Sequence, residues 1–134
     1  MTNIKTLGDP HLGKEFKNGV PLHRRGEREK QQWAEFERHL NDVEADDVHV
    51  CLGDLFDAFS VDEAVVLRAA EIYKNATRGN DGVEYFILRG NHDAVRDADK
   101  MSSFDVFAAL MADVENITVV CERAILQGDF LFCP

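Results

Sequence analysis

The sequence alternates short strand-like runs with segments whose apolar residues repeat at helical spacing, and this alternation limits the folds that the chain can adopt. Three runs are typical of strands: NIKTLG at 3–8, VHVCL at 48–52 and VEYFIL at 83–88. Three segments have the helical pattern: 24–43 (with Trp33, Phe36, Leu40 and Val43 on one face), 60–73 and 103–113. Strands that alternate with helices pair mainly in parallel. We therefore predict an α/β fold, a mainly parallel sheet with flanking helices.

The ends of some elements are also predictable. Ser60 and Glu63 form a capping-box pattern, which predicts the start of the second helix, and its apolar spacing continues to about Tyr73. TRGNDG at 77–82 has the composition of a loop. The last part of the chain contains three strand-like runs: ITVVC at 117–121, RAIL at 123–126 and FLFC at 130–133. The residues Gln127 to Asp129 predict a tight turn, so the chain should end in a β-hairpin.

A polar cluster that opens with glycine follows each of the first three strand-like runs. The clusters are GDPH at 8–11, GDLFD at 53–57 and GNHD at 90–93. In an open parallel sheet the binding crevice lies at the carboxyl ends of the strands, so clusters at three successive strand ends converge in space. Glycine lets the backbone leave a strand through conformations that other residues resist. We therefore predict one site built from all three clusters.

The side chains of these clusters are of the kinds that bind transition metals. Asp9, His11, Asp54 and Asn91 offer carboxylate, imidazole and amide groups, a mixture that suits Mn²⁺, Fe²⁺ or Zn²⁺ better than Mg²⁺ or Ca²⁺. A carboxylate can bridge two ions, and Asp54 is the candidate bridge because it lies between the other ligands in the sequence. Two ions about 3.5–4 Å apart can activate a shared water and stabilise a pentavalent phosphorus.

Three further side chains of the clusters have candidate roles beside the metals. His92 would stand next to the phosphate and protonate the leaving oxygen, and Asp93 would hold the other ring nitrogen of His92. Asp57 is expected to support a ligand rather than to bind an ion itself. The clusters thus predict a catalytic pair, His92 and Asp93, next to four metal ligands.

Taken in this order, GDPHLG, GDLFD and GNHD resemble the D-x-H, G-D-x-x-D and G-N-H-[DE] pattern of the calcineurin-like metallophosphoesterase superfamily. The GDLFD and GNHD forms are more similar to nucleases and phosphodiesterases than to protein serine/threonine phosphatases. HLGKEF, the helix RRGEREKQQWAEFERHL and LGDLFD resemble SbcD-type exonuclease subunits of bacteria and phages. The resemblance covers essentially the whole chain. It implies a centre of two divalent ions, with Mn²⁺ as the first expectation and Fe²⁺ or Zn²⁺ as alternatives.

The resemblance also implies ligands that this sequence lacks. Members of the superfamily carry a further single histidine and a G-H-x-H pair downstream of GNHD, whereas all five histidines here lie at or before His92. Residues 1–134 are therefore expected to be a single, truncated domain, the N-terminal half of a metallophosphoesterase α/β sandwich. The other ligands would come from the remainder of a longer or split product, or from another chain.

Charge is distributed unevenly along the sequence. The net charge is −10, which argues against a general nucleic-acid coat protein, yet residues 14–30 contain six Lys or Arg and three Glu. Lys14, Lys17, Arg24 and Arg25 are candidate contacts to a DNA backbone, and the alternative is that this segment is simply the solvated start of a helix. DNA is the expected partner. An SbcC-like ATPase partner and a homodimer are implied by the resemblance alone.

Composition predicts where the protein resides. No apolar run reaches the roughly 20 residues of a membrane helix, and the N-terminus has neither the basic nor the apolar region of a signal peptide. The three cysteines are odd in number and lack a CxxC spacing, which favours thiols over disulfides. We expect a cytoplasmic protein of a bacterial or phage-infected cell, with no membrane partner.

Three functions are compatible with these features. The preferred one is metal-dependent phosphodiester hydrolysis by a DNA exonuclease or endonuclease subunit of the SbcD type. The second is a small-molecule phosphodiesterase or phosphatase on the same scaffold. The third is a catalytically inactive fragment that acts as an interaction module. The first is preferred because the ordered motifs occur together with the basic helix.

Overall fold

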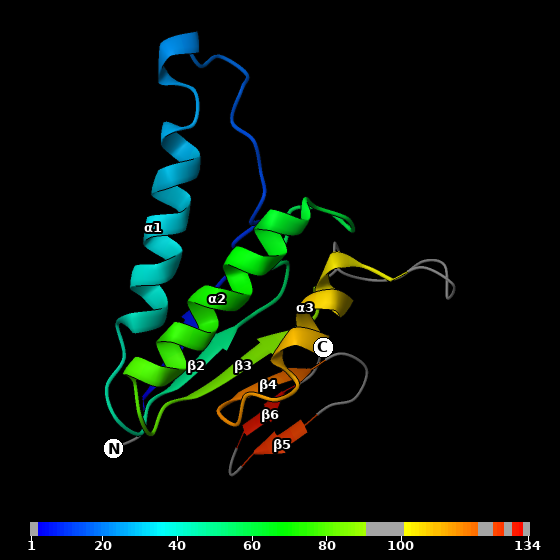
Figure 1. The fold of residues 1–134 in the computed structure, drawn as a ribbon. Helices are drawn as coiled ribbons and strands as arrows, with labels where there is room; N and C mark the ends of the chain where they lie inside the picture. The colour runs from blue at the N-terminus through cyan, green and yellow to red at the C-terminus, as the bar shows by residue number, and fades with distance from the viewer. Residues whose placement is uncertain (1–2, 91–100, 121–124, 128–129, 133–134) are drawn as a thin grey trace.

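Four parallel strands form the central sheet. The computed structural model describes residues 3–90, 101–120, 125–127 and 130–132. The strands are β1 (Ile4–Leu7), β2 (Val48–Cys51), β3 (Glu84–Leu88) and β4 (Ile117–Val120), in the spatial order β1-β2-β3-β4 (Figure 1). Each neighbouring pair is parallel, with Leu7 opposite Cys51 and Cys51 opposite Ile87, so β1, β2 and β3 end nearly level. The predicted α/β fold with a parallel sheet is confirmed.

Three helices pack on one face of this sheet: α1 (Glu27–Asn41), α2 (Glu63–Gly79) and α3 (Ser103–Met111) (Figure 1). Because side chains alternate along a strand, Tyr85 and Ile87 of β3 join the helices in the main core. Phe86 and Leu88, between and after them, belong to a second buried cluster on the opposite face of the sheet. Burial on both faces explains why β2 and β3 read as mainly apolar runs, whereas β1 is half-buried or exposed. Within the described residues, no helix is both long and apolar enough to cross a bilayer.

The first helix begins later than its apolar pattern predicts. Residues Leu22–Arg24 form a short 3₁₀ helix, η1, and Gly26 has a φ of 91° before α1 begins. This left-handed conformation suits glycine and interrupts the helical path, so the predicted start near Arg24 is wrong by about one turn. The predicted core face is confirmed, because its aromatic and leucine side chains are buried: Trp33, Phe36 and Leu40.

The N-terminus of α2 is capped by a different residue from the one predicted. Asp62 is the N-cap, and its Oδ1 accepts a hydrogen bond of 3.3 Å from the backbone N–H of Ala64, so the predicted cap at Ser60 is wrong. Aspartate and serine cap about equally well, and here Asp62 stands directly before the helix. A capping box does occur at α3, where Ser102 and Asp105 bond reciprocally.

The C-terminus of α2 also differs from the prediction. The helix continues through Gly79, beyond the predicted end near Tyr73 and into the segment predicted as a loop. Ala76 and Thr77 are buried, because they extend the core-facing stripe by three and four residues from Tyr73. Asn80 then closes the helix by donating its Nδ2–H to the carbonyl of Ala76 at 2.8 Å.

The end of the chain contains the predicted hairpin. Strands β5 (Ile125–Gln127) and β6 (Phe130–Phe132) pair antiparallel in a separate two-stranded sheet. The predicted turn residues Gly128 and Asp129 lie outside the described residues.

Two histidines meet between α1 and β2. His49 on β2 is fully buried, and its Nε2 lies 2.8 Å from Nδ1 of the half-buried His39 on α1. The ring of Tyr85 on β3 lies 5.5 Å from the His49 ring, centroid to centroid. Burial, and to a lesser degree the charge of His39, lowers the pKa of His49 to about 4. His49 is therefore a neutral part of the core at neutral pH.

Acidification is expected to destabilise the fold through His49. In the unfolded chain this side chain takes up a proton near its ordinary pKa of 6.5, whereas in the folded chain it does so only at about 4. Between these values the unfolded state binds more protons, so the free energy of unfolding falls as the pH falls. From pH 7 to pH 4.5 the expected loss from this group is about 2–3 kcal/mol. Urea titrations at both pH values measure it.

The control for this prediction is a matched pair of variants. His49→Gln should remove this part of the pH dependence, whatever its effect on stability at pH 7. His23→Gln changes an exposed histidine and should keep the wild-type dependence. Equal pH dependence in the wild type and in His49→Gln would show that His49 is not the responsible group.

Candidate metal centre

The turns after β1 and β2 bring together three of the four predicted metal ligands. Asp9 and His11 follow β1, Asp54 follows β2, and one ligand atom of each lies within 4.8 Å of the other two. Asp9 is exposed and the other two side chains are half-buried, so solvent and a ligand have access to the group. Atoms that lie 2.0–2.2 Å from a common ion are at most about 4.4 Å apart, so small side-chain rotations would let all three bind one ion.

Backbone hydrogen bonds hold the two turns side by side. The N–H of His11 donates to the carbonyl of Asp54 at 3.0 Å, and the N–H of Leu12 donates to the carbonyl of Leu55 at 2.8 Å. The N–H of Asp57 then donates back to the carbonyl of Leu12 at 2.9 Å. Leu12 and Leu55 are fully buried and anchor the turns in the core. The parallel pairing of β1 and β2 thus continues into the turns and fixes the candidate ligands relative to one another.

The candidate ligands have unusual backbone conformations. Asp9, His11 and Asp54 have φ values of 35°, 48° and 48°, and the other non-glycine residue with positive φ in the described part of the chain is Asp46. Such conformations cost energy in residues that carry a Cβ, and they concentrate at functional sites. Three of them at two neighbouring strand ends indicate that the turns are shaped to direct these side chains into the site.

Two side chains support the turn that carries His11. An oxygen of the Asp57 carboxylate lies 3.6 Å from Nδ1 of His11, as expected for a residue that supports a ligand. The two atoms are farther apart than in a hydrogen bond, so Asp57 places a negative charge beside the His11 ring. Gln32 on α1 donates from Nε2 to the carbonyls of Pro10 (2.7 Å) and His11 (3.0 Å). No sequence pattern pointed to Gln32, because its role depends on how α1 packs.

The residues at the carboxyl end of β3 are in contact with those at the carboxyl end of β2. A Cβ added at Gly90, after β3, would overlap the backbone nitrogen and Oδ1 of Asp54 and would lie 2.8 Å from its Cγ. A Cβ at Gly53, where φ is 128°, would lie 3.1 Å from the Cα of Gly90. GDLFD and the first residue of GNHD are therefore in direct contact. The other predicted residues of this cluster, Asn91, His92 and Asp93, lie outside the described residues.

Comparison with known families decides the class of this site. The model of the family described as calcineurin-like phosphoesterases matches residues 2–133. The chain belongs to this family. A search of curated proteins finds no significant match to this chain, which is called the phosphoesterase below.

Membership of the family implies divalent metal ions, and the residues of the phosphoesterase suit them. The group formed by Asp9, His11 and Asp54 supplies two carboxylates and an imidazole, which are ordinary ligands of Mn²⁺, Fe²⁺ and Zn²⁺. All three ligands are placed by strained turns that the neighbouring backbone holds in position. Metal-dependent hydrolysis of phosphoesters is the chemistry that this site supports.

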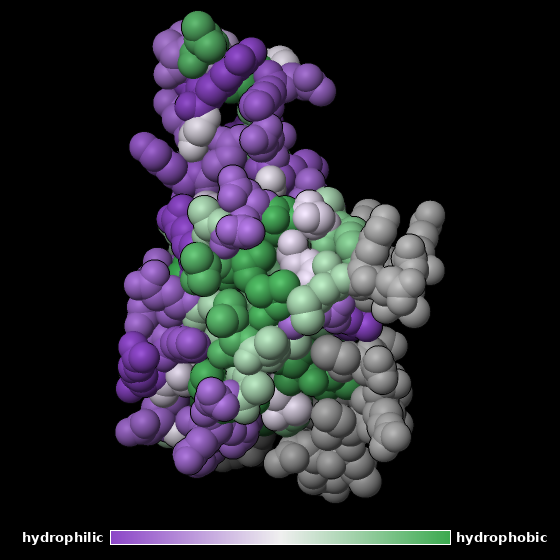
Figure 2. Space-filling view, turned by 45° about the vertical axis from the view of Figure 1, so that its right-hand side comes forward, coloured by the Kyte–Doolittle hydropathy of each residue, from purple (hydrophilic) through white to green (hydrophobic). Residues whose placement is uncertain are grey.

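A basic arm projects beside the metal centre of the phosphoesterase. We define the arm as residues 14–30, which run outward from the His11 turn and return along the start of α1, beyond the other helices (Figure 1). Its surface is mostly hydrophilic (Figure 2). The four predicted DNA contacts on it are all exposed: Lys14, Lys17, Arg24 and Arg25. Lys17 and Arg24 pair with exposed glutamates at 2.6 and 3.1 Å, and such pairs contribute little stability, so a phosphate could replace the glutamate.

The two limbs of the arm are joined through Phe16. Its backbone N–H donates to Oε1 of Glu29 on α1 at 2.5 Å, and this hydrogen bond lowers the pKa of Glu29. Lys14 and Arg28 lie over its ring, with Nζ and Cζ at 5.5 and 5.9 Å from the centroid. The outgoing limb is therefore tied to α1, and the cations of the arm are carried on a supported element rather than on an isolated loop.

Proposed function

We propose that this phosphoesterase is a nuclease that hydrolyses phosphodiester bonds of DNA with two divalent ions, Mn²⁺ first among them, as the resemblance to SbcD-type subunits suggests. The observation that carries the proposal is the basic arm next to the candidate metal centre. The rest of the chain is strongly acidic, so a cationic arm at this place is unexpected unless the substrate extends along it. A small phosphoester would be held at the centre alone.

The arm has a suitable reach for a polymeric substrate. Gln32 bonds to the turn that carries His11, so this point of α1 is fixed beside the centre. From Gln32 to Glu27 the helix rises about 1.5 Å per residue, and the arm continues beyond the helix start. The cations near its tip therefore stand on the order of 10 Å from the turn. Phosphates of one DNA strand recur about every 3.4 Å along the axis, so the arm would meet phosphates a few nucleotides from the scissile bond.

The residues of the centre have separate tasks in this proposal. Asp9, His11 and Asp54 would hold the ions, with Asn91 as a fourth ligand. When bound, the ions would supply an activated water and stabilise charge on the phosphorus. Asp57 would support the His11 ring when the ring binds an ion, and Gln32 holds the turn that carries His11. We propose that His92 protonates the leaving oxygen and that Asp93 orients His92.

Metal content and substrate range test the proposal. The purified chain should hydrolyse bis-p-nitrophenyl phosphate with Mn²⁺ and lose this activity in EDTA, and it should cut duplex or single-stranded DNA. Hydrolysis of cyclic nucleotides or p-nitrophenyl phosphate without DNA cleavage would instead favour the small-molecule phosphoesterase. A chain that binds a stoichiometric protein partner and turns over no diester would favour the interaction module and would refute the nuclease.

Removing the charges of the arm should weaken DNA cleavage selectively. The variant with Gln at Lys14, Lys17, Arg24 and Arg25 should raise the KM for DNA, and each phosphate that the arm no longer neutralises should reduce the slope of log K against log salt by about 0.9. The rate on bis-p-nitrophenyl phosphate should stay unchanged, because this small diester does not reach the arm. Arg78→Gln, which changes an exposed cation near the far end of α2, is the matched control. An unchanged salt slope would show that the arm does not bind the DNA backbone.

Several parts of the proposal rest on the resemblance alone and stay predictions. They are an ATPase partner subunit, a homodimer and completion of the ligand set by histidines from outside residues 1–134. The cytoplasmic location, which rests on composition, also stays a prediction. Light scattering of the purified chain measures the dimer directly. Metal analysis measures how many ions the chain binds by itself, and one ion instead of two would indicate that the second set of ligands comes from elsewhere.

A further inference from the structure

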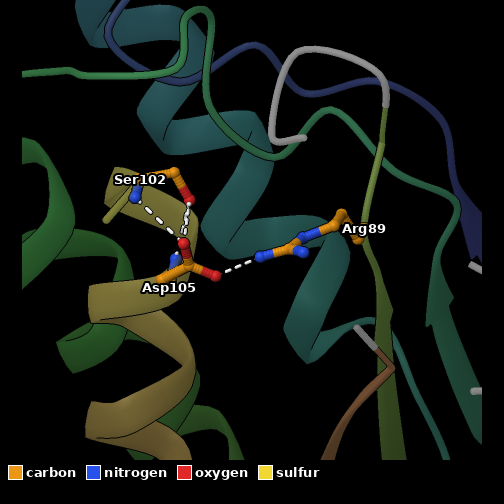
Figure 3. A network of polar contacts seen from close by, with 3 residues as sticks. All are labelled: Arg89, Ser102 and Asp105. Atoms are coloured by element: carbon orange, nitrogen blue, oxygen red, sulfur yellow. Dashed lines mark hydrogen bonds and ion pairs between the residues drawn. The ribbon is translucent and has the colours of Figure 1, made fainter. Parts of the chain in front are cut away.

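An ion pair joins the carboxyl end of β3 to the start of α3 (Figure 3). Arg89 directly follows β3, and its Nη2 donates to Oδ1 of Asp105 on α3. The two side chains are mostly buried, with 16% and 23% of their surface exposed. The Arg89 guanidinium also lies over the ring of Phe104, 5.7 Å from its centroid. This pair is thus shielded from water, unlike the exposed ion pairs of the arm.

The carboxylate that Arg89 contacts is itself fixed. Oδ2 of Asp105 accepts hydrogen bonds from the backbone N–H and the hydroxyl of Ser102, both at 2.9 Å (Figure 3). The N–H of Asp105 donates to Oγ of Ser102 at 3.1 Å and completes the capping box. One carboxylate oxygen therefore accepts the hydrogen bonds from Ser102 at the helix cap, and the other accepts the hydrogen bond from Arg89. The start of α3 offers Arg89 a rigid partner.

The backbone of Arg89 leads directly to the metal centre. Its N–H donates to the carbonyl of Val120 at 3.1 Å, so it is still paired with the end of β4. The next residue is Gly90, which packs so closely on Asp54 that no Cβ would fit between them. A shift of the β3 end would therefore press Gly90 against the candidate bridging ligand or withdraw it from that ligand.

We propose that Arg89 is a positioning residue: by joining the end of β3 to Asp105, it holds Gly90 against Asp54 and so fixes the geometry of the metal site. Arg89 acts through Gly90 and touches no substrate. The inference rests on the proposed metal-dependent function. It adds a contribution from α3 to a site whose described ligands follow β1 and β2.

The affinity for Mn²⁺ alone is the first readout. Calorimetric titration of Mn²⁺ into the metal-free chain should show that Arg89→Gln weakens binding about tenfold, the lower part of the range for residues that orient metal ligands. Asp105→Asn should have a similar effect, and the double variant should bind no more weakly than either single variant, because both remove the same ion pair. Arg78→Gln removes an exposed guanidinium on α2 and should stay within about twofold of the wild type.

Kinetics separate positioning from a merely structural role. For bis-p-nitrophenyl phosphate, Arg89→Gln should lower kcat about tenfold and leave KM within about twofold, because Arg89 does not touch the substrate. Arg89→Lys keeps the charge and should recover part of both the affinity and kcat. Each variant is assayed well below its own melting temperature, so that loss of folded protein does not enter the comparison.

The outcomes distinguish this inference from the proposed function. Variants that melt at lower temperature but keep the wild-type Mn²⁺ affinity and kcat would overturn the positioning role. If the wild type binds Mn²⁺ but hydrolyses no diester, the proposed function fails, and the tenfold difference in affinity still decides the role of Arg89. A wild-type chain that binds no Mn²⁺ would overturn both.

Discussion

Replacing Asp54 by Asn is expected to lower the metal-dependent hydrolysis of bis-p-nitrophenyl phosphate by roughly 10³-fold. Asn has the shape of Asp but lacks the negative charge and the second oxygen that a bridging ligand needs. Loss of a properly held ion removes several kcal/mol of transition-state stabilisation, and each 1.4 kcal/mol corresponds to about tenfold in rate. The measurement is kcat with saturating Mn²⁺ for the wild type and the variant. A variant with near wild-type kcat would remove Asp54 from the metal site.

A stability measurement shows whether this loss is local. Without metal, Asp54→Asn should melt no lower than the wild type. The substitution removes the repulsion between the negative charges of Asp54 and Asp9, which lie in the same group. With Mn²⁺ at 100 times its Kd, the wild type should gain about 2.7 kcal/mol and the variant much less. Asp46→Asn is the matched control. It makes the same change at another aspartate with positive φ, which precedes β2 and so lies at the opposite end of that strand.

Gly90→Ala is expected to disrupt both the fold and the site. The added Cβ would overlap the backbone nitrogen and Oδ1 of Asp54, and neither the backbone nor a metal ligand can move aside without consequences. Overpacking costs about 1–3 kcal/mol and more where the backbone must shift, so we expect about 3 kcal/mol. A displacement of Asp54 by about 1 Å would also lower kcat on the order of 10²-fold. Urea titration and Mn²⁺-dependent kinetics measure the two effects.

The same substitution at another glycine is the control. Gly79 ends α2 and has no atom within 4 Å of an added Cβ. Gly79→Ala should therefore leave kcat unchanged and keep or raise the free energy of unfolding, by up to about 1 kcal/mol, because alanine is the better helix former. If Gly90→Ala behaved like Gly79→Ala, the close contact between Gly90 and Asp54 could not be what holds the metal site together.

Much of the fold was predictable because its signals are local. The alternation of strand-like and helical runs indicated a parallel sheet, and the apolar β2 and β3 runs agree with their burial on both faces. Helix boundaries were less predictable. The interruption before α1 depends on the left-handed conformation of Gly26, and the extension of α2 depends on burial of Ala76 and Thr77 against the core. Neither condition can be read from a short window of sequence.

The candidate metal centre was also predictable only in part. The sequence indicated which side chains could bind metal, because Asp9, His11 and Asp54 follow strand-like runs and match the pattern of a known superfamily. Nothing in it indicated Gln32 or Arg89. Their roles depend on contacts with residues that lie far away along the chain: the His11 turn for Gln32, and the start of α3 for Arg89.

Local sequence is enough to predict the alternation of strands and helices, the three polar clusters and the kinds of ligand that they offer. These features follow from side-chain chemistry and from periodicity within a few residues. The folded chain was needed to show that Asp9, His11 and Asp54 lie within reach of one ion, that Gly90 packs on Asp54, and that α1, which carries part of the basic arm, is bonded to the His11 turn. Those facts depend on the register of β1, β2 and β3 and on the packing of α1 and α3, which are contacts between distant parts of the chain.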